Sequence, residues 1–152
     1  MIHEQKLEVL YTELPYWPSV SFLANLRNVE LVFLENCEHF VKSSNRNRCW
    51  IASANGPLLL TVPIAGGRSH KQLYREVWPD DAKNWRRSHW HSLQSAYGKS
   101  PYFEFYADEL AGFYHGAPQP LWNFNIVLFQ WLLAKLGFST TVELTDDFRA
   151  TY

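Results

Sequence analysis

The densest group of polar side chains lies between positions 42 and 48, where the chain reads Lys-Ser-Ser-Asn-Arg-Asn-Arg. An arginine guanidinium binds phosphate or carboxylate through two parallel hydrogen bonds, and asparagine adds a neutral donor and acceptor. This composition predicts a binding site for an anion. Its candidate ligands are Lys42, Asn45, Arg46, Asn47 and Arg48. The alternative is a structural cluster, in which these cations pair with Glu35 and Glu38.

His89 is the candidate catalytic acid or base. In the segment 81–97, Trp85, His89 and Leu93 recur at a spacing of four, which places them on one face of a helix. An imidazole titrates near neutral pH and can therefore move a proton during catalysis. The alternative is a core histidine whose ring is satisfied by a backbone carbonyl. His91 points in another direction, so the two histidines do not chelate a metal.

Aromatic residues make up 16% of the chain, including seven tryptophans. This content predicts either a bulky core or a pocket lined with rings for a flat or sugar-like ligand. Tyr16, beside two prolines, and Trp85 are the candidates for a stacking wall. Both would contact the same substrate as the cationic cluster.

Several classes of function are disfavoured. No glycine-rich phosphate loop is present, and the two cysteines lack the paired spacing of a zinc site, so we predict no cofactor and no metal. Cys49, next to a cation, is either an inert core residue or a nucleophile. The net charge of −1 argues against nucleic acid as a partner, although basic and aromatic residues alternate near Arg86. The apolar segment 121–138 is too polar to span a membrane, and the polar N-terminus predicts a cytoplasmic protein.

The elements that would position these residues can be read from local patterns. Two β-prone runs flank Asn55-Gly56, which predicts a hairpin whose mouth adjoins the cationic cluster. Ser19 is a candidate helix cap, and Ser100 is another. The predicted strands are 7–12, 29–34, 48–53, 58–64, 73–78 and 140–144, and the predicted helices are 20–27, 81–97, 101–115 and 121–136. The chain is therefore predicted to be one α+β or open α/β domain, residues 1–152, with a small mixed sheet and three main helices in its second half.

The order of several motifs resembles one known family. They are Leu-Pro-Tyr-Trp-Pro-Ser-Val from Leu14, Glu-His-Phe-Val-Lys-Ser from Glu38, Asn-Arg-Asn-Arg-Cys from Asn45, Leu-Thr-Val-Pro from Leu60, Asn-Trp-Arg with His-Trp from Asn84, and Ser-Pro-Tyr-Phe-Glu-Phe-Tyr from Ser100. In these motifs and their spacing, the chain resembles the WbqC-like family over roughly residues 7–145.

The resemblance implies a role in surface polysaccharide synthesis. Members occur among genes for O-antigen, and glycyl or aminoacyl transfer onto a sugar has been suggested for one branch. On this basis the chain is expected to be a transferase in which Arg46 and Arg48 hold an anionic activated donor or nucleotide sugar. His89 would deprotonate an amine acceptor. The rival expectation is a non-catalytic module of the same pathway that binds a small molecule or a protein.

Two departures from the family pattern are visible. Asn45 stands where the family usually has a tyrosine, so one aromatic contact with the substrate is expected to be missing. Asp147-Phe148-Arg149 resembles the start of a further family element, whose Gly-Phe and Asn-Leu-Ser tail does not follow here. The resemblance therefore implies a domain without that tail.

Overall fold

Three short parallel strands form the first sheet of the computed structural model, which describes residues 8–66 and 71–147. Strand β2 (Leu31–Leu34) lies between β1 (Val9–Thr12) and β5 (Thr141–Leu144). The register pairs Leu34 with Thr12 on one side and with Leu144 on the other. Because all three strands are parallel, their carboxyl ends meet at one edge of the sheet.

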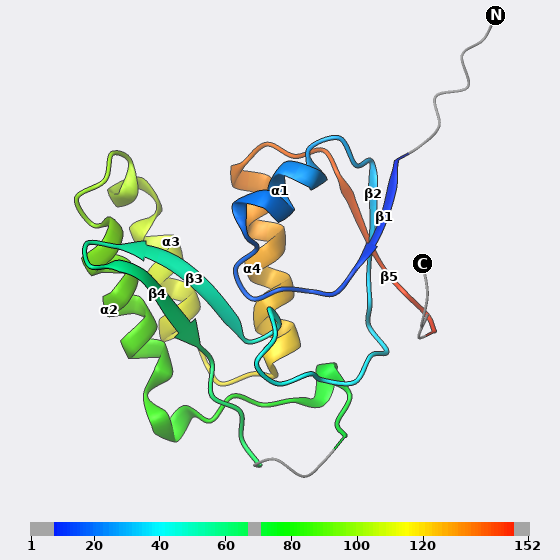
Figure 1. The fold of residues 1–152 in the computed structure, drawn as a ribbon, viewed down its shortest axis with the longest axis horizontal. Helices are drawn as coiled ribbons and strands as arrows, with labels where there is room; N and C mark the ends of the chain where they lie inside the picture. Colours follow the sequence, from blue (N-terminus) through cyan, green and yellow to red (C-terminus); the bar gives the residue numbers. More distant parts are fainter. Residues whose placement is uncertain (1–7, 67–70, 148–152) are drawn as a thin grey trace, which may run out of the picture.

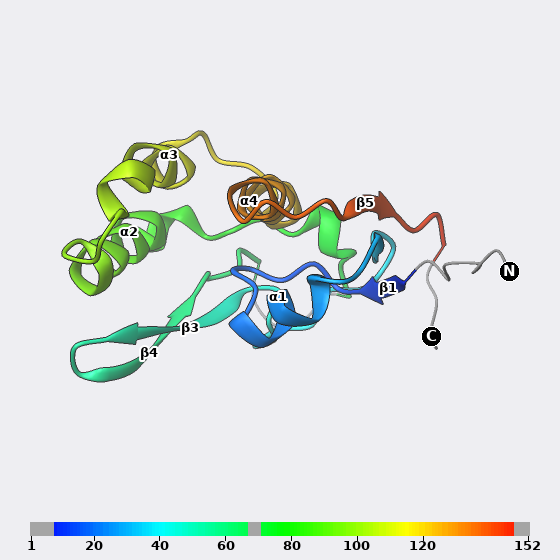
Figure 2. The ribbon, with the colours of Figure 1, turned by 90° about the horizontal axis from the view of Figure 1, so that it is seen from above.

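Helices α1 (Val20–Leu26) and α4 (Leu121–Lys135) lie on the same face of this sheet (Figures 1 and 2). Val32 and Leu34 of β2 point toward the helices and are fully buried, whereas Leu31 and Phe33 are half-buried. The prediction of a strand near 29–34 is therefore confirmed, but only one face of β2 is fully covered. The Ser19 hydroxyl accepts the Phe22 amide N–H, so the predicted cap of α1 is present.

The predicted hairpin forms a second, separate sheet. Strands β3 (Arg48–Ser53) and β4 (Gly56–Thr61) are antiparallel, and the register runs from Arg48 opposite Thr61 to Ser53 opposite Gly56. Gly56 has a φ of +106°, a conformation that favours glycine. The hairpin mouth, where Arg48 and Thr61 lie, opens toward the centre of the molecule (Figure 1).

Helices α2 (Trp85–Tyr97) and α3 (Phe103–His115) pack together beside the hairpin (Figure 1). The Tyr97 hydroxyl accepts the Ala52 amide N–H at 3.1 Å, which ties the end of α2 to β3. α4 lies between this half of the molecule and the first sheet (Figures 1 and 2). Seven side chains of α4 are buried, as expected of a central packing helix.

Two local predictions are wrong. The segment 73–78 forms a short 3₁₀ turn, Tyr74–Glu76, because Tyr74 turns inward and is fully buried. A second 3₁₀ turn, Asp81–Lys83, precedes α2. Ser100 does not cap α3: its hydroxyl donates to the Tyr97 carbonyl, and Tyr102 precedes the helix with a φ of +67°.

The described part of the chain thus has a mixed α+β fold with the hairpin in the first half and three main helices in the second, as predicted. Its strands divide into two sheets instead of forming one. None of the helices in residues 8–66 and 71–147 has the length and apolar character needed to cross a bilayer. Phe148 and Arg149, which belong to the last family-like element, lie outside the described residues.

Candidate functional site

A buried chain of hydrogen bonds connects α1's entry loop to the hairpin through His89. The Trp17 indole Nε1 lies 2.8 Å from the Tyr114 hydroxyl, which lies 2.9 Å from the Tyr16 hydroxyl. The Tyr16 hydroxyl lies 2.7 Å from Nδ1 of His89, and Nε2 of His89 lies 3.2 Å from the Thr61 carbonyl oxygen. Tyr16, Tyr114 and His89 are all buried.

The two ends of this chain fix its direction. An indole N–H only donates and a carbonyl only accepts, so Nε2 of neutral His89 carries the proton and Nδ1 accepts from Tyr16. Tyr16 in turn accepts from Tyr114, which accepts from Trp17. Every polar atom of the chain is then satisfied. Burial lowers the pKa of His89 from 6.5 to about 4, although the Thr61 carbonyl acts in the opposite direction. At neutral pH His89 is uncharged, and both ring nitrogens are occupied.

Arg46 is enclosed by carboxylates. Its Nε donates to Oε1 of Glu38 at 2.9 Å, its Nη2 pairs with Oε2 of Glu38, and its Nη1 lies 2.6 Å from Oε2 of Glu13. Nη1 also contacts the Ser44 hydroxyl. We call Arg46, Glu13 and Glu38 the Arg46 cluster. It lies at the carboxyl edge of the first sheet, because Glu13 directly follows β1.

Burial and pairing act against each other in the Arg46 cluster. Burial raises the pKa of Glu38, and its hydrogen bonds to Arg46 only partly offset this effect. For Arg46, burial lowers the pKa, but the Glu38 carboxylate outweighs it and the net direction is upward. The guanidinium therefore stays charged, and its N–H donors are bound to protein carboxylates. This geometry corresponds to the structural alternative for the cationic stretch, with Glu38 as the main partner.

The other predicted ligands are dispersed. Asn47 is buried, and its Nδ2 donates to the Val62 carbonyl at 3.0 Å, which fixes the hairpin mouth. Arg48 is half-buried at the start of β3, and Lys42 is exposed. Asn45 is exposed beside a cleft described below. The structure thus brings Tyr16, Trp85 and His89 together in the core and leaves Lys42 and Asn45 at the surface.

Trp85 is buried and makes no open stacking wall. Its indole Nε1 donates to Oδ1 of Asp81 at 2.8 Å, and its ring packs edge-on against His89 and Phe124. The Arg86 guanidinium lies over the same ring, 4.9 Å from its centre. A cleft that is lined by other aromatic side chains lies beside α1 and the hairpin.

A cleft of about 650 Å³ opens between α1, the hairpin and the helices α2, α3 and α4. We call it the aromatic cleft, after the aromatic side chains that line it: Trp17, Phe22, Trp50, Tyr97, Tyr102, Phe103, Tyr106 and Trp131. Trp50 is 67% exposed and Tyr102 is 71% exposed, which is unusual for such large rings. Apart from Asn45, none of the residues predicted as ligands from the sequence lines it.

Cys49 also borders the aromatic cleft, but its side chain is a protonated thiol and not a reactive thiolate. Burial raises its pKa to about 12, which leaves only a trace of nucleophilic thiolate at neutral pH. The burial of Cys49 favours the alternative in which it is an inert core residue and not a nucleophile. In the described parts of the chain, no three His, Cys, Asp or Glu side chains are grouped so that they could hold a metal ion.

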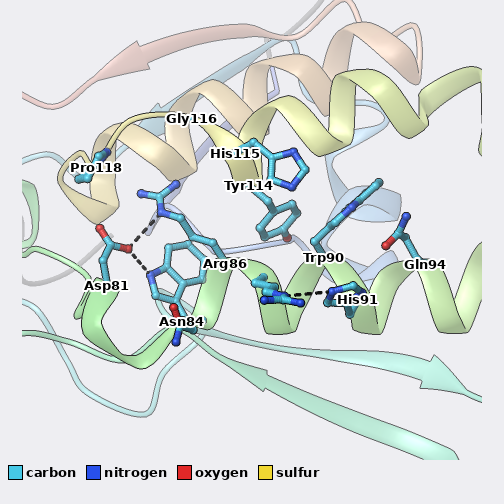
Figure 3. Close-up of a pocket in the computed structure, with 12 residues that line it drawn as sticks. Asp81, Asn84, Arg86, Trp90, His91, Gln94, Tyr114, His115, Gly116 and Pro118 are labelled. Carbon is cyan, nitrogen blue, oxygen red and sulfur yellow. Dashed lines mark hydrogen bonds and ion pairs between the residues drawn. The ribbon is translucent and has the colours of Figure 1, made fainter.

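A second pocket, of about 520 Å³, lies between the first half of α2 and the end of α3 (Figure 3). Its lining includes four basic or titratable side chains, Arg86, Arg87, His91 and His115, and we call it the basic pocket. Asp81 is its one acidic lining residue among the described side chains. The basic and aromatic run at Arg86 is visible in the sequence, but His115 lies at the far end of α3, and only the packing of α3 on α2 brings the two into one pocket.

Sequence comparison supplies a classification for this mixed α+β domain. Residues 15–151, nearly the whole chain, match the WbqC-like protein family, and the chain belongs to that family. No curated protein and no solved structure matches the chain.

Proposed function

We propose that this chain is a binding protein for a sugar-containing small molecule, which it holds in the aromatic cleft. The observation that carries the proposal is the pair of exposed rings, Trp50 from the hairpin and Tyr102 from the loop before α3, that line one cleft. Small-molecule sites are concave, mostly apolar and equipped with a few polar groups. A sugar ring has one apolar face that stacks on an aromatic ring and hydroxyl groups around its edge.

The aromatic cleft offers the polar groups that such a ligand needs. Asn45 and Lys135 line it, and so does Tyr97. The Tyr97 hydroxyl accepts a hydrogen bond from the Ala52 amide N–H, and no other hydrogen bond of this hydroxyl is found among the described residues. Its own proton therefore remains available to a ligand hydroxyl. These groups would orient the sugar, while the rings would supply most of the contact area.

The geometry favours binding over catalysis at the predicted centre. A general base must reach the proton that it removes, and both nitrogens of His89 are already engaged inside the core. Its lowered pKa also makes it a weak base at neutral pH. Arg46 is likewise paired with Glu38 and Glu13. Neither residue lines the aromatic cleft.

Group transfer is the second candidate, supported by membership of the WbqC-like family. In that version the aromatic cleft holds an amino sugar of a surface polysaccharide, in the cytoplasm, as the acceptor of a glycyl or aminoacyl group. The amine would attack the acyl carbon of an activated donor, so that an amide bond forms while the bond to the donor's leaving group breaks and that group takes up the amine proton. No acyl intermediate would form on Cys49, because its thiol is not activated. The binding proposal does not depend on this step.

The test is a binding measurement with neutral sugars and amino sugars, made by saturation-transfer NMR and calorimetry. Trp50→Ala should weaken binding by at least about tenfold, as expected when an aromatic anchor is removed. The matched control is Trp78→Ala, because Trp78 is 48% exposed and lies outside both pockets. Equal loss in both variants, or no sugar bound by the folded wild-type protein, would overturn the proposal.

A further inference from the structure

The basic pocket has a charge balance that sets it apart from the aromatic cleft. Arg86 and Arg87 carry fixed positive charge, while Asp81, the single carboxylate of the lining among the described residues, is paired with Arg86. Its Oδ1 accepts from the Trp85 indole at 2.8 Å and from Nε of Arg86 at 3.1 Å. Figure 3 shows Asp81 at one end of the pocket and His91 and Gln94 at the other. Asp81 therefore balances the charge of Arg86, and the net positive charge of the lining comes from Arg87.

Arg86 and Arg87 both have N–H donors that lack a partner among the described residues. Arg87 is exposed, and its Nε contacts Nε2 of His91 at a long 3.4 Å. No other hydrogen bond of this guanidinium is found in the described residues. Nη1 of Arg86 donates to the Phe113 carbonyl, while Nη2 is buried and unpartnered within that same part of the chain. A buried N–H donor without a partner, beside an exposed guanidinium, favours an anionic acceptor nearby.

The start of α2 adds to the positive potential of the basic pocket. Asn84 precedes the helix with a φ of +50°, and its side chain forms no capping hydrogen bond. The first turn of α2 contains no acidic residue. Uncapped amides at the start of a helix carry partial positive charge and favour anions. Asn84 and Trp85 both line the basic pocket.

The donors approach from more than one side. Arg87 belongs to the first turn of α2, whereas His115 ends α3 and packs edge-on against Trp90. In Figure 3 His115 and Trp90 project from different helices into the same pocket. A phosphate group presents acceptor oxygens in several directions and carries more charge than a carboxylate. Its shape and charge match donors that converge from two helices.

We propose that the basic pocket binds the phosphate group of a small molecule, with Arg87 and His115 as direct ligands and Arg86 as a fixed charge in its wall. This site is separate from the aromatic cleft, because the two linings share no described residue. The proposed site lies on α2 and α3, apart from the anion site near Arg46, which stays a prediction from the sequence. The proposal does not rest on sugar binding.

The experiment is a titration of the ¹⁵N-labelled full chain with inorganic phosphate at constant ionic strength, followed by amide chemical shifts. Saturable shifts are expected at 84–87 and 114–116. Arg87→Gln should weaken phosphate binding by about tenfold or more, since a charge-assisted hydrogen bond is lost. His115→Gln should weaken it as well. Arg75→Gln is the matched control, because Arg75 is an exposed arginine outside both pockets.

Three results would overturn the proposal: shifts that do not saturate, equal binding by Arg87→Gln and Arg75→Gln, or an equal response to acetate. The last would show a site for carboxylates instead of phosphate. Because Arg87 is exposed and makes a single long hydrogen bond within residues 8–66 and 71–147, its variant is expected to keep the wild-type melting temperature. Trp50→Ala should bind phosphate like the wild type, which separates this outcome from that of the sugar-binding test.

Discussion

The Tyr16 hydroxyl lies 2.7 Å from Nδ1 of His89, although 73 residues separate the two in sequence. This bond places one side chain from the loop before α1 against one from the middle of α2. It completes a chain of donors that ends on the hairpin at Thr61. One imidazole therefore holds three separate segments together, which gives His89 a structural role that accounts for its burial.

The first prediction concerns Tyr16→Phe. The change removes the hydroxyl that donates to His89 and accepts from Tyr114, so two buried polar groups lose a partner. We expect the free energy of unfolding to fall by about 1–3 kcal/mol, measured by urea denaturation. Tyr102→Phe is the control, because Tyr102 is exposed and makes no hydrogen bond through its side chain among the described contacts. Equal stability of both variants would mean that the buried chain contributes nothing.

The second prediction is a pH dependence that belongs to His89. Its pKa is about 4 in the folded protein and about 6.5 when unfolded. Between these values the unfolded state binds a proton that the folded state does not, so stability is complete above pH 6.5 and is lost as the pH falls toward 4. At pH 5 the loss should be about 2 kcal/mol.

The comparison of His89→Gln with His91→Gln isolates this effect. Both variants lack one histidine of α2, but only His89 is buried. Urea unfolding at pH 7 and pH 5 should show a smaller drop in stability for His89→Gln than for the wild type. His91→Gln should keep the wild-type drop. An unchanged drop in His89→Gln would contradict the assignment.

The third prediction concerns the Arg46 cluster. Arg46→Ala leaves Glu38 buried without its cation, and breaking a buried ion pair in this way typically costs about 3–5 kcal/mol. Since Arg46 also forms an ion pair with Glu13, we expect a loss in this range by thermal or urea unfolding. Arg75→Ala, at an exposed site, should change stability by less than about 0.5 kcal/mol. A fully stable Arg46→Ala protein with lost ligand binding would instead support the original anion hypothesis.

The fourth prediction separates the two cysteines. Because its pKa is about 12, only roughly one Cys49 thiol in ten thousand is ionised at pH 8. Iodoacetamide should therefore modify half-exposed Cys37 first and leave Cys49 intact until the protein unfolds. Peptide mass spectrometry after a short reaction gives the answer. Rapid modification of Cys49 in the folded protein would restore it as a candidate nucleophile.

The sequence predicts the parts of this fold that depend on local chemistry. The hairpin follows from β-prone runs around Gly56, and α1 follows from the Ser19 cap. The inward direction of His89 follows from helical spacing. The 3₁₀ turn at Tyr74 could not be predicted, because it depends on a hydroxyl that donates to the carbonyls of Leu14 and Arg46 in distant loops.

The candidate site was harder to predict for the same reason. A basic stretch does not reveal whether its cations face solvent, a ligand or carboxylates. Arg46 meets Glu13 only because β1 ends next to the hairpin mouth, and that contact joins segments 33 positions apart. The aromatic cleft gathers Trp17, Trp50 and Trp131 from three regions of the chain. Composition indicated that such a pocket was possible, but only the fold shows which rings form it.

The measurement that tests the central claim most directly is calorimetric titration of the wild-type chain, Trp50→Ala and Trp78→Ala with an amino sugar. The account predicts saturable binding by the wild type and Trp78→Ala, at least about tenfold weaker binding by Trp50→Ala, and similar melting temperatures for all three proteins. Binding that survives in Trp50→Ala but is lost in His89→Gln, with that variant still folded, would contradict it. The ligand would then lie at the buried histidine and not in the aromatic cleft.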